Sequence, residues 1–368
     1  MKRVVIASDS FKGCLSSREV AGGVSTVIRE LFPSCETVCL PMADGGEGTA
    51  EALQAALGGR FRTKSVRGPL GDPVEADYLA AGSLAVIEMA RASGLTLIPP
   101  ERRNPSLATT FGTGELIADA VANGCRDILV GIGGSATNDG GMGALAALGW
   151  RFLDADGRVL EPVGASLGKV ARIDAAGVLP AMKACRIRVA CDVDTPFCAA
   201  ATVFAPQKGA DAAMVRQLEE GMARFAGIVR AATGVDLMDL PGAGAAGGLG
   251  GALHAFLGAQ LLPGAELVLD AMDFDTRAAG ADLIITGEGR MDAQTLRGKA
   301  PAAVLGHAGK LGIPVLAVVG SLAGARPEGF RDVLAVTPQQ MPLAEALRPE
   351  TARRNIERAL RAYWAIPK

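Results

Sequence analysis

The 368-residue sequence has few aromatic side chains, only two histidines and almost no excess of charge. It contains two Trp and two Tyr, and its formal net charge is −2. A basic face with stacking aromatic residues, which is typical of nucleic-acid binding, is therefore missing, and we expect no nucleic-acid partner. The seven cysteines are odd in number and form no CxxC pair, which argues against a disulfide scaffold and against a zinc ribbon.

Long hydrophobic runs are missing as well. The apolar run at the N-terminus ends at Ser8-Asp9 and is too short for the core of a signal peptide, and no stretch is long enough to span a bilayer. We therefore expect a cytoplasmic protein without a membrane partner. A P-loop is also excluded, because each Gly-Lys pair is followed by Val, Ala or Leu and not by Ser or Thr.

Glycine is abundant, with 48 residues, and many of these glycines stand beside acidic or hydroxyl residues. Such clusters indicate loops built from backbone, because tight turns and close approach to a ligand favour a residue without a Cβ atom. The length of the chain exceeds that of most single cores and predicts two domains.

Buried strands followed by helices occur at both ends of the chain. Two apolar strands, in VVIA and TVCL, precede residue 45, and three more lie in ADLIITG, IPVLAVV and DVLAVTP near the C-terminus. Five such strands predict a flavodoxin-like parallel sheet, so the fold class is α/β. We predict one domain from residues 1–61 and 274–368, with a second, mixed α/β domain inserted at 62–273. Turn signals between residues 60 and 90 predict an antiparallel meander at the start of the insert.

Acidic residues follow five of the predicted strands. They are Asp9, Asp44, Asp139, Asp192 and Glu288. Ligands of open α/β sheets bind beyond the carboxyl ends of the strands, so these positions suit a binding site. A single acid there is commonly a cap of the next helix, but five acids, most with adjacent glycines, favour a shared site.

The segment GIGGSATNDGG, residues 131–141, lies between a predicted strand and a predicted helix. Its glycines allow backbone N–H groups to converge on an anion, and the N-terminus of the next helix adds positive potential. We predict that this loop binds phosphates of a nucleotide cofactor. The residues assigned to this role are Gly131, Gly133, Gly134, Ser135, Asn138 and Asp139.

Three cations stand in loops next to the acids: Lys12, Lys208 and Arg290. Arginine suits bidentate binding of a carboxylate or phosphate, and lysine acts as a point charge. Carboxylates, glycine loops and cations, without a histidine base, fit phosphoryl transfer from ATP with Mg²⁺, which depends on positioning and charge neutralisation. Both histidines, His254 and His307, lie in predicted helices and are expected to be structural.

Two other functions stay open at this point. GAGAAGG contains a formal GxGxxG at Gly242, Gly244 and Gly247, which is the pattern of a nucleotide-cofactor oxidoreductase, but the preceding VDLMDLP is a poor strand. A non-catalytic small-molecule sensor on a flavodoxin-like domain is the second alternative, and it leaves the clustered acids unexplained.

Several segments together resemble the bacterial glycerate kinase family of the glycerate 2-kinase type. They are DSFKGCLSS, MADGGEGT, GTGEL, GIGGSATNDGGMG, CDV, PQKGA, PGAGAAGG and TGEGRMDAQTLRGK, in the order of the family. The resemblance implies transfer of the γ-phosphoryl group of ATP to D-glycerate with Mg²⁺, with 2-phosphoglycerate as the product in preference to 3-phosphoglycerate. It also implies two α/β domains, one of them flavodoxin-like, with the active site in the cleft between them.

The roles predicted for single residues follow from this reading. Asp192 is the predicted general base, with Asp44 as its competitor, and Lys12 and Arg290 are expected to hold the substrate carboxylate or the transferring phosphoryl group. Glu288 or Asp44 would bind Mg²⁺. The residues expected at the substrate are Asp9, Ser10, Lys208 and Asp292. We expect a monomer or a homodimer.

One loop departs from the family pattern. The stretch from Asp192 to Lys208, DVDTPFCAAATVFAPQK, is a few residues shorter than usual between Phe197 and Val203. Ala205 also stands where glycine is common. The shape of this loop, and any substrate contact from it, is therefore expected to differ from other members.

Overall fold

A computed structural model describes residues 1–292, 295 and 298–365. The contacts between Cα atoms divide the chain into two compact units. The first consists of Met1–Asp44, Glu51–Gly58 and Ala265–Lys368, and the second of Gly45–Ala50 and Gly59–Gly264. The domain limits predicted from the sequence, 1–61 with 274–368 and 62–273, stay a prediction.

The first unit is built on a five-stranded parallel sheet with the order β15-β13-β11-β1-β2. Numbered within the unit, this order is 2-1-3-4-5, which is the order of flavodoxin-like sheets, and the predicted flavodoxin-like domain and α/β class are confirmed. The strands are β1 (Arg3–Ser8), β2 (Glu36–Cys39), β11 (Leu283–Gly287), β13 (Val315–Val319) and β15 (Asp332–Ala335). A short parallel pair, β12 (Arg290–Met291) and β14 (Ser321–Leu322), lies beyond two of them.

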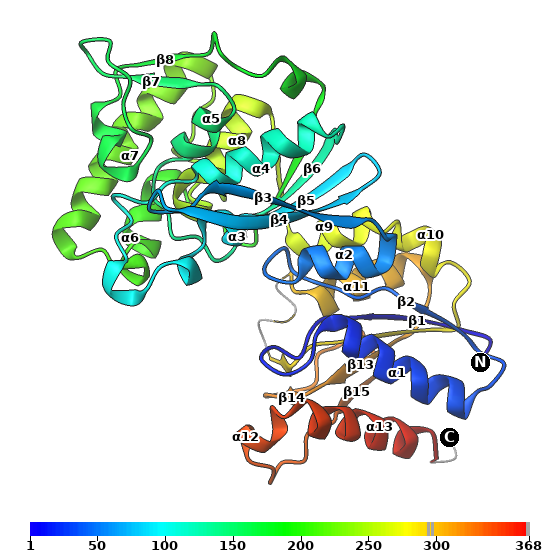
Figure 1. Ribbon diagram of the computed structural model, residues 1–368. Coiled ribbons are helices and arrows are strands. Elements are labelled where there is room, and N and C mark those ends of the chain that lie inside the picture. Colours follow the sequence, from blue (N-terminus) through cyan, green and yellow to red (C-terminus); the bar gives the residue numbers. More distant parts are fainter. Residues whose placement is uncertain (293–294, 296–297, 366–368) are drawn as a thin grey trace. The chain divides into compact units, whose positions relative to one another are not determined.

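Helices cover both faces of this sheet, which explains why its central strands are uniformly apolar. α1 and α13 lie on one face, and α11 with its neighbours lies on the other (Figure 1). α1 begins directly after Ser16, whose side chain accepts a hydrogen bond from the Glu19 N–H while Glu19 binds back to the Ser16 N–H, a reciprocal cap. The helices are α1 (Ser17–Leu31), α2 (Thr49–Leu57), α9 (Gly264–Ala271), α10 (Phe274–Ala278), α11 (Ala300–Leu311), α12 (Leu343–Ala346) and α13 (Pro349–Ala365).

The second unit is built on a six-stranded mixed sheet with the order β10-β9-β6-β5-β4-β3. The meander predicted for residues 60–90 is confirmed, because β3 pairs with β4 and β4 with β5 in antiparallel fashion, whereas the other neighbours are parallel. The strands are β3 (Arg60–Arg67), β4 (Pro73–Ala81), β5 (Leu84–Glu88), β6 (Asp127–Gly131), β9 (Arg186–Ala190) and β10 (Gln260–Leu262). A separate antiparallel pair consists of β7 (Arg151–Leu153) and β8 (Arg172–Asp174).

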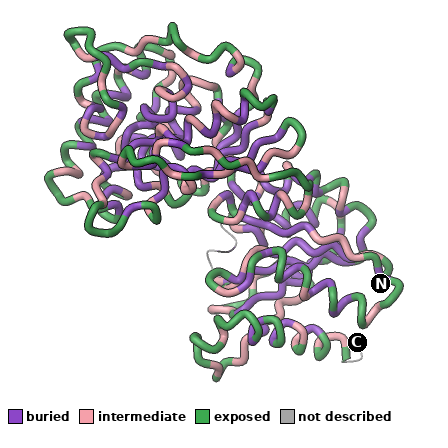
Figure 2. Tube along the Cα trace, viewed as in Figure 1, coloured by how far each residue is buried: buried purple, intermediate pink, exposed green. Residues whose placement is uncertain are grey.

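Helical segments of the second unit pack around this sheet and its buried strands, which Figure 2 shows in purple. The α-helices are α3 (Ala90–Ser93), α4 (Phe111–Ala122), α5 (Met142–Ala147), α6 (Ala200–Phe204), α7 (Ala212–Thr233) and α8 (Leu249–Leu257). The 3-10 helices are η1 (Leu95–Leu97), η2 (Pro100–Arg102), η3 (Gly164–Lys169), η4 (Pro180–Ala184), η5 (Phe197–Ala199), η6 (Pro206–Lys208) and η7 (Ala245–Gly248). Over the described residues, no helix is both long enough and apolar enough to cross a membrane.

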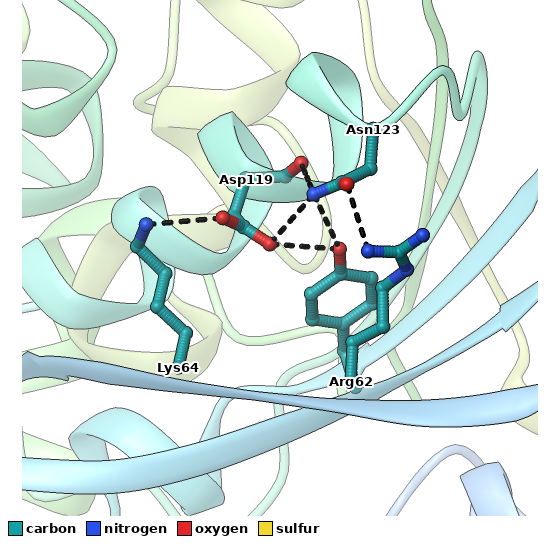
Figure 3. A network of polar contacts seen from close by, with 5 residues as sticks. Arg62, Lys64, Asp119 and Asn123 are labelled. Atoms are coloured by element: carbon teal, nitrogen blue, oxygen red, sulfur yellow. Dashed lines mark hydrogen bonds and ion pairs between the residues drawn. The ribbon is translucent and has the colours of Figure 1, made fainter.

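A polar network fixes the β3–β4 hairpin to helix α4 (Figure 3). The hydroxyl of the fully buried Tyr78 donates to Asp119 Oδ2 at 2.9 Å, and the Lys64 ammonium binds Asp119 Oδ1 at 3.0 Å. Arg62 donates to Asn123 Oδ1 at 2.7 Å. Burial, followed by the hydrogen bond to Asp119, raises the pKa of Tyr78, so the hydroxyl stays a donor. This network gives the meander a fixed position beside the helix that begins at GTGEL.

Candidate active site

Three acids of the first unit lie near one another at the carboxyl ends of its strands, and we call Asp9, Asp44 and Glu288 the acid edge. Asp9 directly follows β1, and its N–H donates to Gly287 O of β11 at 2.9 Å. Burial, together with the negative charges of Asp44 and Glu288, raises the pKa of Asp9 to about 6 against the opposing hydrogen bond from Ser10. The strand order thus brings these predicted residues together, as expected for the ends of neighbouring parallel strands.

Glu288 is the buried member of the acid edge, with 7% of its surface exposed. Its Oε1 accepts a hydrogen bond from Thr295 Oγ1 at 2.5 Å, and its Oε2 lies 3.4 Å from Lys299 Nζ. Burial raises the pKa of Glu288, while these two partners oppose the shift. Sequence reasoning missed both partners, although they stand in the TGEGRMDAQTLRGK motif; residues 293–294 and 296–297 of that motif lie outside the described residues.

Glycines bring the backbone of the acid edge unusually close together. A Cβ atom on Gly287 would lie 1.9 Å from Val318 O, and one on Gly320 would lie 2.3 Å from Gly289 O. Gly320 N also donates to Glu288 O at 3.0 Å. Gly287 and Gly320 are therefore required by the close packing at the ends of β11 and β13, next to Glu288.

The other predicted residues of the first unit surround this edge. Lys12 and Arg290 are exposed, and Ser10 is half-buried with its N–H 2.6 Å from Asp9 Oδ1. Asp292 is half-buried and lies 4.0 Å from Lys299 Nζ. All predicted residues of this unit therefore occur beyond the carboxyl ends of its main strands, with Arg290 in the short strand β12.

The donor set of the acid edge fits a hard cation. Its side chains offer carboxylate oxygens, which Mg²⁺ prefers, and their mutual repulsion would be relieved by positive charge. In the described part of the chain, no three Asp, Glu, His or Cys side chains are grouped closely enough to hold a metal by themselves. Mg²⁺ takes one or two carboxylates and completes its shell with water and phosphate oxygens.

The second unit has a different arrangement at its strand ends. We use the name glycine edge for the ends of β5, β6 and β9 together with the segment 45–50, which passes over them. A Cβ atom on Gly131 would lie 2.3 Å from Gly45 O, and one on Gly45, with φ +84°, would lie 2.2 Å from Ala190 Cβ. The loop DGGEGT thus runs directly across the strand ends, which only glycine permits.

Glu88 anchors this passing segment. It ends β5 with 3% of its surface exposed, and its Oε1 accepts a hydrogen bond from the Ala50 N–H at 2.9 Å. Its Oε2 pairs with Arg91 at 2.9 Å, and Arg91 also binds Asp77 at 2.5 Å. Sequence reasoning missed Glu88, although an acid directly after the apolar run LAVI is the same signal that identified Asp9.

The loop at residues 131–141 has an accessible tip and a buried base. Gly133 and Gly134 are exposed and Ser135 is half-buried, whereas Asn138 and Asp139 are fully buried. The tip is held by Leu95 N, which donates to Gly134 O at 2.9 Å, and by Ala136 N, which donates to Ser93 O at 3.0 Å. Backbone and hydroxyl groups of residues 133–135 are therefore the part of this loop that a ligand can reach.

Asp139 supports the loop from within. Its Oδ2 accepts hydrogen bonds from Thr110 N, Thr110 Oγ1 and Gly143 N at 2.7, 2.8 and 3.1 Å, and its Oδ1 accepts one from Gly141 N at 3.0 Å. Burial raises the pKa of Asp139, and these hydrogen bonds oppose the shift. The neighbouring Asn138 amide contacts the sulfur of Met222. Both side chains were predicted to bind the cofactor, and their burial instead suits a role in holding the loop.

Lys208 lies beneath the same loop, with 2% of its surface exposed. Its Nζ donates to Ser135 Oγ at 2.8 Å and to Thr137 O at 2.7 Å. Burial lowers the pKa of Lys208 to about 7, and the charge of Asp139 partly opposes this. The loop that precedes Lys208, which we expect to depart from the family pattern, forms η5, α6 and η6.

Asp192 lies in the second unit, just beyond β9, and is exposed. Its Oδ1 accepts a hydrogen bond from Gly264 N at 2.8 Å, at the first residue of α9. The structure therefore places the predicted base Asp192 with the glycine edge and its competitor Asp44 with the acid edge.

GAGAAGG does not form a dinucleotide fingerprint, because residues 234–241 before it contain no strand in the described structure. It packs against the 131–141 loop: Gly140 N donates to Gly247 O at 2.9 Å, and a Cβ atom on Gly247 would lie 2.2 Å from Thr137 O. Ala246 adopts a left-handed conformation with φ +53°, which is strained for a residue with a side chain. The oxidoreductase alternative therefore loses its structural basis.

The histidines lie in helices, as predicted. His254 of α8 has its Nδ1 2.9 Å from Ala259 O. His307 of α11 is bound on both ring nitrogens, by Asp275 at 2.6 Å and by Glu266 at 2.9 Å. Burial would lower the pKa of His307, but the two carboxylates outweigh it and the net shift is upward.

Comparison with known proteins gives one consistent result. A family model described as the glycerate kinase family matches residues 4–366. A protein named glycerate kinase from Halalkalibacterium halodurans is 45% identical over 97% of both chains, and one named glycerate 2-kinase from Escherichia coli K12 is 47% identical over 87% of this chain and 85% of its own. A crystal structure assigned to glycerate kinase 2 of Salmonella typhimurium LT2 superimposes with a TM-score of 0.89 at 43% identity, covering 99% of this chain and 100% of the other. The resemblance inferred from the ordered motifs is confirmed.

Proposed function

The chain belongs to the glycerate kinase family, and on that premise we propose that it transfers the γ-phosphoryl group of ATP to D-glycerate in a Mg²⁺-dependent reaction. We propose 2-phosphoglycerate as the product. The relative from Escherichia coli, named glycerate 2-kinase and 47% identical, supports this choice over 3-phosphoglycerate. The enzyme would act in the cytoplasm as a monomer or a homodimer.

The acid edge is the observation that carries this proposal. Phosphoryl transfer needs charge neutralisation more than covalent chemistry. Asp44 and Glu288 would hold the metal ion, and Mg²⁺ bound there would neutralise negative charge on the transferring phosphoryl group. Burial is the main cause of the raised pKa of Asp9, and the charges of Asp44 and Glu288 add to it; a bound cation would relieve both.

The tip of the 131–141 loop is the proposed binding site for the phosphates of ATP. Its exposed residues Gly133 and Gly134 and the hydroxyl of Ser135 offer donors to anionic oxygens. Gly131 would maintain the close approach of the segment 45–50. Asn138 and Asp139, which are fully buried, would hold the loop in shape without touching the nucleotide.

Asp192 remains the proposed general base. It is exposed, the hydrogen bond from Gly264 N at 2.8 Å fixes its Oδ1, and a carboxylate can accept the proton of a substrate hydroxyl. Asp44 is the competing candidate. The exposed cations Lys12 and Arg290 would hold the substrate carboxylate or the phosphoryl group, and Asp9, Ser10 and Asp292 would line the substrate.

Incubation of the protein with ATP, Mg²⁺ and D-glycerate tests the proposal. Formation of ADP is followed first, and phosphorus NMR then separates 2-phosphoglycerate from 3-phosphoglycerate. L-glycerate and a reaction with chelator serve as controls. No ADP above the rate without glycerate would overturn the proposed activity, and 3-phosphoglycerate as the main product would overturn the proposed position of transfer.

A further inference from the structure

Lys208 is a charged side chain at a place with almost no access to water. It ends η6, and 2% of its surface is exposed. The turn that carries it is fixed, because Gly209, with φ +97°, packs so closely on Arg103 that a Cβ atom would lie 2.5 Å from Arg103 O. Burial of an ammonium group is costly unless its donors are satisfied, and lysine is rarely found fully buried.

The hydrogen bonds of Lys208 determine whether the Ser135 hydroxyl acts as a donor or as an acceptor. An ammonium group has three donors and no acceptor. In the charged form of Lys208, Ser135 Oγ, at 2.8 Å from Lys208 Nζ, is therefore the acceptor in this contact. The hydrogen of the Ser135 hydroxyl is then directed to a different acceptor, and Ser135 is the half-buried residue between the exposed tip and the buried base of its loop.

The second hydrogen bond fixes the backbone of the same loop. Lys208 Nζ donates to Thr137 O at 2.7 Å, and the fully buried Thr137 also has its Oγ1 3.4 Å from Ala246 O. One side chain thus holds a hydroxyl and a carbonyl two residues apart. Such a bridge restricts residues 135–137 and, through them, the tip at 133–135.

We propose that Lys208 is a positioning residue for nucleotide binding, which orients the Ser135 hydroxyl as a donor to a phosphate oxygen at the tip 133–135. The inference rests on the proposed function, in which this tip binds the phosphates of ATP. Lys208 was predicted to touch the substrate; in this assignment it touches no ligand and acts through Ser135. Its burial lowers its pKa to about 7, and a phosphate bound above it would favour the charged form.

A double-mutant cycle tests whether Lys208 acts through Ser135. Calorimetry with ATP alone gives the Kd of the wild type, Ser135→Ala, Lys208→Met and the double variant. Loss of a hydrogen bond to a charged oxygen predicts a Kd about tenfold higher in each single variant. The double variant should bind within about twofold of Ser135→Ala, because removal of Ser135 already removes the group that Lys208 orients.

Two results would overturn the inference. A double variant about a hundredfold weaker than the wild type would mean that the residues act independently. Unchanged Kd in Ser135→Ala would mean that the tip binds no phosphate. Lys183→Met, which alters an exposed lysine of the same unit, is the matched control and should bind as the wild type does.

Lys208→Gln covers the case in which Lys208→Met does not fold. The glutamine amide can donate to Ser135 without a charge, so its Kd should lie between those of the wild type and Ser135→Ala. A Kd above that of Ser135→Ala would show a route other than Ser135 and overturn the inference.

The assay also separates this inference from the proposed function. If ATP binding follows the predicted cycle but no glycerate is phosphorylated, the proposed acceptor is wrong and the role of Lys208 stands. If turnover is normal and the cycle is additive, only the role of Lys208 is wrong. A wild type that does not bind ATP would overturn both.

Discussion

In both units the candidate residues lie near the ends of parallel strands, yet a carboxyl group with a shifted pKa lies at one edge and an ammonium group with a shifted pKa at the other. At the acid edge, burial and neighbouring carboxylates raise the pKa of Asp9 to about 6. At the glycine edge, burial lowers the pKa of Lys208 to about 7. Each group is held in a state that is unfavourable without a ligand: the first would gain from a cation and the second from an anion. If the proposed function is right, one sheet end would be adapted to a metal ion and the other to a phosphate.

The largest expected effect concerns which edge supplies the base. Asp192→Asn should lower kcat by about 10²–10⁴ and leave the KM for ATP nearly unchanged, because the amide cannot accept the proton of the substrate. Asp44→Asn should mainly raise the Mg²⁺ concentration needed for half-maximal activity. Steady-state kinetics over a Mg²⁺ series measures both. Near-normal kcat in Asp192→Asn with loss of kcat in Asp44→Asn would place the base at the acid edge.

The second prediction concerns the free energy of unfolding that the acid edge costs when no metal is bound. Asp9→Asn should raise the free energy of unfolding at pH 7.5 in chelator by about 1–3 kcal/mol. The pKa of Asp9 is about 6 in the fold against 3.8 in the unfolded chain, so the wild type loses stability as the pH rises from 3.8 to 6, and the variant lacks this loss. Denaturant unfolding between pH 4.5 and 7.5 measures the difference.

Mg²⁺ sharpens the same prediction. It should stabilise the wild type more than Asp9→Asn, since the variant has less repulsion to relieve. Glu328→Gln, which alters an exposed acid of the first unit, is the control and should follow the wild type at every pH. Equal stabilisation of the wild type and Asp9→Asn by Mg²⁺ would mean that the ion binds elsewhere.

The third prediction is the counterpart at the glycine edge. The pKa of Lys208 is about 7 in the fold against 10.5 in the unfolded chain. Between these values the unfolded chain binds the additional proton, so the wild type should gain stability relative to Lys208→Met as the pH rises from 7 to 9, by about 1 kcal/mol per pH unit. Unfolding midpoints at three pH values measure this. Lys183→Met should show no such trend. If the stability of the wild type relative to Lys208→Met falls as the pH rises, the lowered pKa of the buried Lys208 is contradicted.

The smallest effect is expected away from both edges. Tyr78→Phe removes a buried hydroxyl that donates to Asp119, and it should lower the free energy of unfolding by about 1–2 kcal/mol. The KM and kcat should stay unchanged, because the network of Figure 3 joins β4 to α4 and includes no candidate site residue. A change in KM for ATP would show that the position of α4 is transmitted to the 131–141 loop through Thr110.

The positions of residues that directly follow apolar runs were the most predictable part of the molecule. Val4, Val5 and Ile6 are fully buried in β1, and a run of this kind fixes both the strand and the place where Asp9 must emerge. The same reasoning locates Glu288 after β11 and Gly131 at the end of β6. The number of strands at the two ends of the chain and their alternation with helices then predict the flavodoxin-like α/β class.

Burial of single polar residues could not be predicted. Lys208 in PQKG has the local composition of a surface turn, and its 2% exposure depends on the loop 131–141, which is distant in sequence. The passage of Gly45 across Gly131 and the left-handed Ala246 have the same origin. Such features arise from contacts between segments that are distant in sequence, so local propensity cannot predict them.

The segment 45–50 has a practical consequence for dissecting the protein. The chain leaves the first unit after Asp44, returns at Glu51, and departs again after Gly58. A fragment excised at 59–264 would lose the Ala50 N–H that Glu88 binds and the backbone that covers Gly131. Expression of the second unit on its own therefore requires residues 45–50 to be spliced to it through a linker. The first unit would then need a bridge between residues 44 and 51.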